Sequence, residues 1–332
     1  MKIIFSESSN LNNSVYGNCQ APIKMFLEKR GEEFEQNSVL KNLFLTGSSK
    51  NYGDVMTTLT AMSGFEPVGE NGAYPLDGMQ EGYQKFLKYQ TWKDSFSVSK
   101  EMIEDGKLLD MRKQPAAFMT SYKRTRELFG AALYGAAMMG NGSVTFKGVK
   151  FDLTGADGSN LFAKEHVPKV SGDKQCNCFK DAFSVDALGK LETKMHLFRG
   201  DNDEILDVAP DTILIPENAD LKKAVFAAIG ADKDPVSANN AFNYQYGRWN
   251  VIVWPYLNHY ITNGVSPWVL LDSKYNETYG GAVWNDRVQL EVRSTVDENT
   301  DANVWRGRSR FNACFNDWRF AAIGGIAAGN SL

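Results

Sequence analysis

The chain has 332 residues, of which 43% are hydrophobic and 12% aromatic, and its formal net charge is −4. This length permits two or three lobes, and the composition is that of a folded protein rather than a disordered one. The slight negative charge argues against binding of nucleic acid through overall charge, which requires a concentrated cationic face. Four scattered cysteines predict no disulfide framework, and we expect neither a signal peptide nor a membrane span.

Residues 1–53 are mostly polar, apart from one helical pattern and a short apolar patch. The helical pattern covers residues 21–34 and includes Phe26, Leu27 and Phe34 among its apolar positions. Pieces this short cannot bury their own apolar faces. We therefore expect this N-terminal arm to lie on another surface.

The next stretch predicts a hairpin. Residues 55–59 and 86–92 are rich in β-branched and aromatic residues, as strands are, and the segment between them is packed with Gly and Pro. A two-stranded hairpin is marginal in water by itself. It must lie either on its own domain or on a neighbouring subunit, and the residues alone leave both possibilities open.

Residues 114–139 predict a helix roughly 40 Å long with one apolar stripe. We expect Pro115 near its first turn, where the missing amide hydrogen costs nothing, and the glycines after residue 139 at its end. Gly135 and the neighbouring alanines would let other backbone approach closely. We interpret this helix as the spine of the molecule, with an ordinary core helix as the alternative. Its predicted packing residues are Phe118, Tyr122, Phe129, Leu133 and Gly135.

The second half of the chain changes pattern. A helix is expected at 181–198, and a strand, a helix and a strand at 212–216, 217–229 and 249–255 predict a compact α/β lobe. Residues 286–322 alternate like long strands that close the spine lobe. Within them Arg306, Arg308 and Arg310 would share one strand face, which could meet phosphate, a neighbour's acids or only water.

A search for catalytic residues finds little. His166, His196 and His259 lie in different segments, and no phosphate-binding glycine loop or nucleophile motif is present. Cys176 and Cys178 could bind zinc together with a histidine, but structural zinc sites usually need two cysteine pairs, so free thiols are the better interpretation. Acid clusters such as residues 101–105 fit helix capping. We expect no catalytic, cofactor or metal site.

The order of several motifs resembles a known family. They are FEPVGENGAYP at 65–75, EGYQKFLKYQTW at 81–92, FSVSKEMIEDG at 96–106, NLFAKEH at 160–166, DTILIPENADLKKAVFAAI at 211–229 and FNACFNDWRFAAIGG at 311–325. In this order they resemble the tailed-bacteriophage major capsid proteins with the Hong Kong 97 fold. The chain is most similar to the Mu-like major head subunits, and the resemblance begins near residue 56.

The resemblance implies an α+β fold with four parts. These are an N-terminal arm at 1–53, an extended β-hairpin loop at 54–95, a peripheral domain at 96–204 and 281–332 around the spine helix, and an α/β axial domain at 205–280. The arm and the loop would contact neighbouring subunits. Implied contact residues are Phe65, Glu66, Glu70, Tyr74, Tyr83, Lys85 and Lys88 in the loop and Phe26, Leu27 and Phe34 in the arm.

The implied function is structural and not enzymatic. Subunits would form homo-pentamers and homo-hexamers, then an icosahedral shell that encloses double-stranded DNA without sequence-specific binding. A portal, and a separate scaffold or decoration protein, are possible partners, and no membrane is involved. The location would be the virion, after assembly in the bacterial host cytoplasm. No cofactor is implied.

Three further points stay open at this stage. An encapsulin-like nanocompartment shell shares the fold, and a cytoplasmic hydrolase that uses the acids near residues 101–105 is an alternative of another class. Some relatives cross-link a loop lysine to a neighbour's asparagine. Lys85 and Lys88 lie in the loop, but no partner asparagine or catalytic acid can be matched to them.

Overall fold

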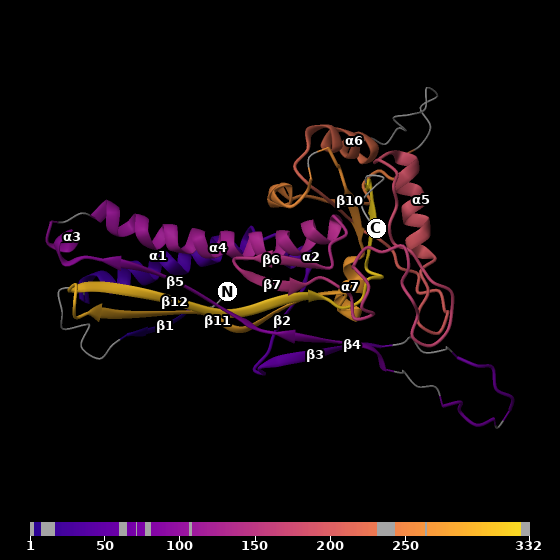
Figure 1. Cartoon of the computed structure of the whole chain (residues 1–332), viewed down its shortest axis with the longest axis horizontal. Helices are drawn as coiled ribbons and strands as arrows, with labels where there is room; N and C mark the ends of the chain where they lie inside the picture. The colour runs from indigo at the N-terminus through magenta and orange to yellow at the C-terminus, as the bar shows by residue number, and fades with distance from the viewer. Residues whose placement is uncertain are drawn as a thin grey trace.

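The computed structural model describes residues 3–7, 17–59, 65–70, 72–76, 81–105, 108–230, 243–262 and 264–326. Helices and strands are both present, which confirms the α+β class. Figure 1 shows an elongated body, in which long helices lie along a long sheet, and an upright body at one end of it. A hairpin leaves the elongated body on the side opposite the upright one.

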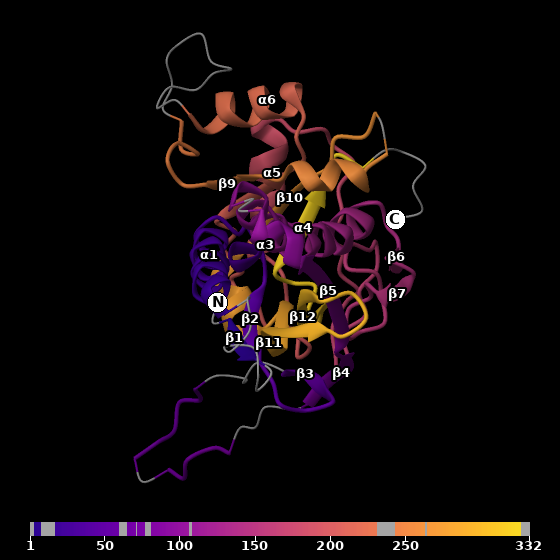
Figure 2. The same ribbon diagram turned by 90° about the vertical axis from the view of Figure 1, so that its left-hand side faces the viewer.

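The elongated body is built on one sheet of very long strands. Its order is β1 (Ile4–Glu7), β11 (Ala282–Asp297), β12 (Ala302–Phe315) and β5 (Gln90–Val98), and β2 (Leu45–Ser48) also pairs with β11. Helices α1 (Gly17–Gln36) and α4 (Leu108–Met138) cover one face of this sheet (Figures 1 and 2). The short helices α2 (Leu40–Leu43) and α3 (Lys100–Glu104) lie at the connections.

Helix α4 is the predicted spine, but it begins earlier than expected. Its 31 residues start at Leu108, so the prediction that Pro115 lies near the first turn is wrong. Pro115 is an interior residue whose ring is buried, and packing offsets the amide hydrogen bond that it cannot donate. The C-terminal end is as predicted. Gly140 has a φ of 76°, and the amide of Asn141 donates to the carbonyl of Ala136 at 3.1 Å, which satisfies an end carbonyl.

The N-terminal arm lies on its own chain. Leu27 is 0% exposed and Phe34 6% exposed, because α1 packs along α4 of the same subunit. The expectation that these two side chains contact a neighbouring subunit is therefore wrong, since a side chain buried within the subunit has no surface left to offer. Phe26 is partly exposed on the same helix.

The upright body holds a four-stranded sheet in the order β13 (Ala321–Gly324), β10 (Trp268–Leu271), β8 (Thr212–Ile215) and β9 (Asn250–Val253). Around it lie α5 (Val185–His196), α6 (Ala219–Ile229), the 3₁₀ helix η2 (Pro255–His259) and α7 (Ser273–Tyr279). The expectation that the whole tail closes the spine lobe is wrong for β13, which pairs antiparallel with β10. All four residues of β13 are apolar or glycine and buried, which suits a strand covered on both faces.

Two small hairpins complete the fold. Strands β6 (Ser143–Phe146) and β7 (Val149–Asp152) pair beside α4, and β3 (Gly53–Leu59) pairs with β4 (Glu81–Lys88) at the base of the predicted loop. The strand expected at 86–92 is divided at Tyr89, because β4 pairs with β3 whereas β5 joins the long sheet.

Candidate assembly surfaces

The described residues of the loop between β3 and β4 are exposed. Phe65, Tyr74 and Leu76 are fully exposed, and Glu66 and Glu70 are exposed beside them. Residues 65–70 and 72–76 form no strand or helix, and they extend away from the body (Figure 1). Large apolar side chains that stand free in this way are typical of an interaction surface.

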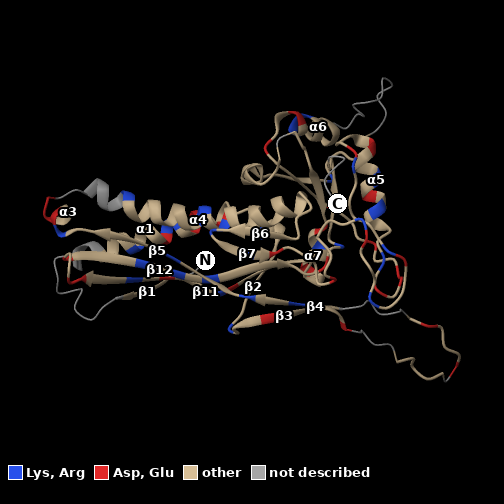
Figure 3. Ribbon diagram, in the orientation of Figure 1, with Lys and Arg blue, Asp and Glu red and all other residues tan. Residues whose placement is uncertain are grey.

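This loop carries charge of one sign. Residues 54–84 contain five acidic residues and no lysine or arginine. In Figure 3 the described part of the loop shows acidic positions only. The loop is therefore suited to bind a surface that carries basic residues.

The root of the hairpin is held by residues 152–169, the segment that follows β7. The ammonium group of Lys169 donates to the carbonyl oxygens of Glu81 at 3.0 Å and Gly82 at 2.6 Å. The hydroxyl of Tyr83 donates to the carbonyl of Val167 at 3.4 Å. These contacts fix the direction in which the hairpin leaves the subunit.

Lys85 takes part in the same root. Its ammonium group lies 3.2 Å from the carboxylate of Asp152 and also donates to the carbonyl of Thr154. Only 9% of its side chain is exposed, which does not fit the expectation that Lys85 contacts a neighbour or serves as a cross-linking lysine. Lys88 is exposed, and its ammonium group lies 5.5 Å from the ring centre of Tyr52.

A carboxylate at the start of β3 ties the root to the long sheet. Asp54 accepts hydrogen bonds from Tyr89, from Ser49 at 2.9 Å and from Asn285 of β11 at 3.4 Å. Burial alone would raise the pKa of Asp54. The hydrogen bonds, led by that from Tyr89, favour the charged form more strongly and leave this pKa below its usual value.

The three predicted arginines do share one face of β12. Arg306 and Arg308 are exposed and Arg310 is partly exposed, while Gly307 between them faces α4, where an added Cβ would meet Phe118. The arginines thus lie on the sheet face opposite the helices. We call this face the arginine strip, and Figure 3 shows basic positions along β11 and β12.

Neighbouring strands extend the arginine strip. In register, Arg306 lies opposite Arg293, and Arg308 lies between Lys93 and Glu291. The guanidinium group of Arg308 is 3.2 Å from the carboxylate of Glu291. Like charges directly opposite in a sheet are destabilising, so the pairing of Arg293 with Arg306 has a cost that an external anionic partner would relieve.

The predicted spine residues lie inside the subunit. Phe129 and Leu133 belong to the main core and Phe118 to a second one, with Tyr122 packed against both. Gly135 is closely approached, because a Cβ there would lie 2.7 Å from the Cβ of Tyr260. The close approach expected at Gly135 is thus made by Tyr260, which directly follows η2 of the same chain.

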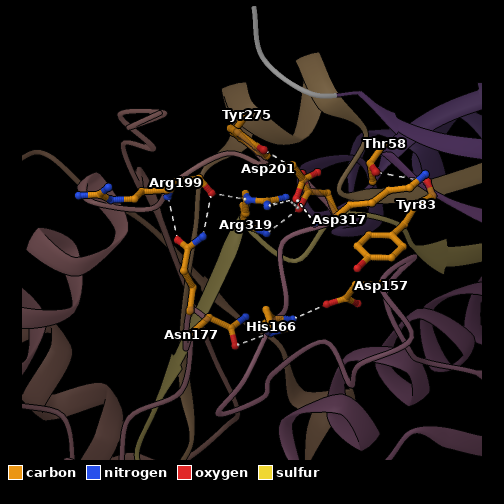
Figure 4. Close-up of polar contacts among 12 residues, drawn as sticks. Thr58, Tyr83, Asp157, His166, Asn177, Arg199, Asp201, Tyr275, Asp317 and Arg319 are labelled. Atoms are coloured by element: carbon orange, nitrogen blue, oxygen red, sulfur yellow. Dashed lines mark hydrogen bonds and ion pairs between the residues drawn. The ribbon is translucent and has the colours of Figure 1, made fainter. Parts of the chain in front are cut away.

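A buried ionic cluster joins the upright body to the last strands (Figure 4). The guanidinium group of Arg319 lies 2.9 Å from Asp201 and 3.2 Å from Asp317, and Tyr275 donates to Asp317 at 2.8 Å. Burial alone would lower the pKa of Arg319, but the two carboxylates raise it. The charges pair with one another, so this cluster holds segments together rather than binding a ligand.

His166 stands at the centre of a second polar cluster (Figure 4). Its ring stacks on Trp318, with 4.1 Å between ring centres. Its Nδ1 lies 2.7 Å from an Asp157 oxygen, and its Nε2 lies 3.2 Å from the side-chain oxygen of Asn177. Both nitrogens face acceptors, so this histidine ties loops together and is not exposed as a base.

The described residues contain no group of three or more His, Cys, Asp or Glu side chains that could hold a metal ion. Within the same residues, no helix is both long and apolar enough to cross a membrane. The acids at 101–105 lie in and after the short helix α3, which Ser99 caps by accepting from the amide of Met102 at 3.3 Å.

A family model described as "Phage capsid protein" matches residues 83–324 of the chain. The chain belongs to this family of phage capsid proteins. It is therefore a structural component of a capsid that self-assembles with copies of itself, and its place is the virion. This membership argues against the hydrolase alternative. No protein with a curated description matches the sequence.

Some solved structures are similar to this capsid protein at low sequence identity. A chain of Mycobacterium phage Patience is 13% identical, with a TM-score of 0.49 and coverage of 100% of this chain and 95% of that one. A capsid chain of Myoviridae Phage XM1 is 10% identical, with a TM-score of 0.49 and coverage of 87% and 91%. A virus-like particle from Pyrococcus furiosus is 10% identical, with a TM-score of 0.46 and coverage of 91% and 97%.

Of the residues that hold the hairpin root, only Tyr83 and Lys85 were among the predicted site residues. Lys169 and Gly82 are 87 positions apart, and Lys85 and Thr154 are 69 apart. No local periodicity links such pairs. His166 lies within the NLFAKEH motif, which pointed to that region but to none of these contacts.

Proposed function

We propose that this capsid protein is the major head subunit of a tailed bacteriophage with a Hong Kong 97-type architecture, related to the Mu-like head subunits. Subunits assemble through pentamers and hexamers into an icosahedral shell around double-stranded DNA. In this proposal the elongated body is the peripheral domain, the upright body is the axial domain, and the hairpin at 54–95 is the extended loop.

The observation that carries the proposal is the contrast between the two ends of the hairpin. Its root is fixed by Lys85 and Lys169, whereas Phe65, Tyr74 and Leu76 near its tip are fully exposed. A rigid support below an uncovered apolar tip suits a contact that is made only after another subunit arrives. Repeating one such head-to-tail contact around a ring produces a closed assembly.

The arginine strip fits as the receiving surface on the neighbour. The loop offers Glu66 and Glu70 without any basic residue, and the strip offers Arg293, Arg306 and Arg308, of which Arg308 is paired with Glu291. The two surfaces lie on different parts of one subunit, so they meet between copies. Complementary charge of this kind guides the encounter of two subunits and fixes the position in which they bind.

The same proposal accounts for the weak overall charge. A net charge of −4 gives the shell little attraction for the DNA phosphates, which suits a container that is filled and emptied. The proposal includes no enzymatic step and no cofactor. A portal, and a separate scaffold or decoration protein, are the expected partners, and assembly takes place in the bacterial host cytoplasm.

Electron microscopy of the purified chain, with and without its genomic neighbours, tests the assembly proposal. Rings, tubes or closed shells are expected, and a monomer under every condition would contradict it. Co-purified DNA or an enzyme cargo then distinguishes a phage head from an encapsulin-like compartment.

Charge exchange tests the pairing of loop and strip. Glu66→Lys with Glu70→Lys, and separately Arg306→Glu with Arg308→Glu, are expected to reduce shell yield about tenfold or more, since like charges across an interface cost several kcal/mol. The combined four-residue exchange is expected to restore part of the yield. Glu28→Lys, an exposed change on α1, is the control. Absence of any rescue would contradict the pairing while leaving shell formation itself untouched.

A further inference from the structure

Two cysteine side chains lie next to each other at the edge of the upright body. The sulfur atoms of Cys176 and Cys178 are 3.5 Å apart, and both residues are partly exposed. Residues two apart in an extended chain point to the same side, which explains the contact. The capsid function described above gives this pair no role.

The residue between them holds the pair in place. Asn177 is fully buried, and its side-chain nitrogen donates to the carbonyls of Leu161 at 2.8 Å and Ala321 at 3.1 Å. Its side-chain oxygen accepts from the amide of Ala163 at 3.0 Å. The backbone on both sides of Cys178 also bonds to Ile323 of β13, because the Asn177 carbonyl accepts from the Ile323 amide and the Phe179 amide donates to the Ile323 carbonyl. These bonds fix the backbone, and the fixed backbone holds the two cysteine side chains next to each other.

The surroundings of the pair favour one thiolate. The Sγ of Cys176 lies 3.5 Å from the Sγ of Cys178, a contact in which either thiol can donate, and it also lies 3.3 Å from the Cys178 carbonyl oxygen and 3.5 Å from the Cys178 backbone nitrogen. Lys194 of α5 and His166 are its basic neighbours. The hydrogen bond from Cys178 is the main cause that lowers the pKa of Cys176 to about 5, and the same bond raises the pKa of Cys178. Lys164 also faces Cys178. A thiolate beside a second thiol is the arrangement required for thiol–disulfide exchange.

We propose that Cys176 and Cys178 form a redox-active dithiol that is oxidised to an intramolecular disulfide by small-molecule disulfides such as oxidised glutathione. The Cys176 thiolate attacks one glutathione sulfur, breaks the glutathione disulfide and releases one glutathione thiolate, which takes a proton from water. Cys178 then loses its proton to water and attacks the Cys176 sulfur. The Cys176–Cys178 bond forms, and the second glutathione leaves as a thiolate that takes a proton from water. The protein loses two electrons, and one oxidised glutathione becomes two thiols.

The geometry requires only a small movement. A disulfide needs a sulfur separation of about 2.05 Å, so side-chain rotation must bring the two atoms about 1.5 Å closer. Cys314 is buried at the hairpin root and takes no part. Zinc is a poorer fit than oxidation, because the described residues offer no third ligand beside the two sulfurs.

The experiment uses the whole chain carrying Cys19→Ser, so that the remaining thiols are the pair and the buried Cys314. The subunit is incubated with oxidised glutathione, quenched with acid, unfolded, alkylated with a maleimide and weighed by mass spectrometry. The expected product has lost two alkylation sites and carries no glutathione. Adding Cys178→Ser should instead trap one glutathione on Cys176, because the resolving thiol is gone.

The pH profile separates this pair from ordinary thiols. Oxidation of the pair should change less than about threefold between pH 6 and pH 8, because Cys176 is already ionised. The reaction of Cys178 in a Cys176→Ser variant should rise about tenfold per pH unit, as for a thiol of ordinary or raised pKa. Glutathione on both cysteines, two free thiols after incubation, or the same steep pH profile in the parent chain would each overturn the proposal. These measurements are made on the subunit and need no shell, so they test the dithiol proposal independently of the assembly proposal.

Discussion

The contact between Gly135 of α4 and Tyr260 provides the sharpest test of the packing. In a Gly135→Ala variant the new Cβ would lie 2.7 Å from the Cβ of Tyr260 and 3.4 Å from its Cγ. Real Cβ atoms do not approach so closely, and a Cβ does not move when its side chain rotates. Relief therefore requires a shift of α4 or of the segment that follows η2.

Two opposing effects determine how much Gly135→Ala changes the free energy of unfolding. Replacing glycine by alanine inside a helix normally stabilises it by about 1 kcal/mol. Overpacking a tight core contact costs about 1–3 kcal/mol. We expect Gly135→Ala to lose about 1 kcal/mol overall, and Gly135→Leu, which must place three more carbons at the same point, to lose about 3 kcal/mol or to fail to assemble.

Denaturant unfolding of the purified subunit, followed by tryptophan fluorescence, measures the loss, and Trp254 beside η2 is a buried reporter. Tyr260→Gly removes the opposing Cβ and serves as the control background. There, Gly135→Ala should change from a loss to a gain of about 1 kcal/mol. A gain from Gly135→Ala in the natural background, or an unchanged melting temperature and shell yield for Gly135→Leu, would refute the reasoning.

Other changes act on the hairpin. Deleting residues 66–80 is expected to leave the subunit folded by circular dichroism but unable to close shells, and normal particles would contradict this. Lys85→Met should cost about 1 kcal/mol, because the carbonyl of Thr154 loses a donor and the mostly exposed Asp152 loses its ion pair, and it should speed proteolysis within the loop; Lys88→Met is the exposed control. The pKa of Asp54 is lowered from 3.8, so its stabilising contribution is complete above about pH 4 and is lost as the pH falls through the folded-state pKa. The stability difference between the natural chain and Asp54→Asn, measured by urea unfolding, should therefore shrink from pH 5 to pH 3, and a constant difference would exclude this role.

The sequence predicted the long elements better than their ends. The apolar stripe of α4 repeats over many turns, so its existence and its C-terminal glycine were predictable. Its start was not, because proline marks the first turn of many helices and only the burial of Pro115 makes an interior position tolerable. Tyr89 was similar. The strand pattern continues through it, but the backbone passes there from the hairpin to the long sheet.

Strand β13 illustrates a different limit. Its four buried residues have the pattern of a strand in either body. Its pairing with β10 depends on the position of Trp268, against which an added Cβ on Gly324 would clash. Such a choice depends on contacts between distant segments. The same holds for the ion pair between Arg319 and Asp201, which are 118 positions apart.

The energetics of the hairpin tip explain why the subunit would leave it uncovered. Burying one large apolar side chain contributes about 1.5–3 kcal/mol, so covering Phe65, Tyr74 and Leu76 offers a neighbour several kcal/mol before the costs of association are subtracted. That amount binds two isolated subunits weakly. In a ring each subunit both donates a tip and receives one, and contacts made together add to far stronger binding than any single one. A tip that is uncovered in the subunit and fixed at its root therefore favours closed assemblies over stray dimers.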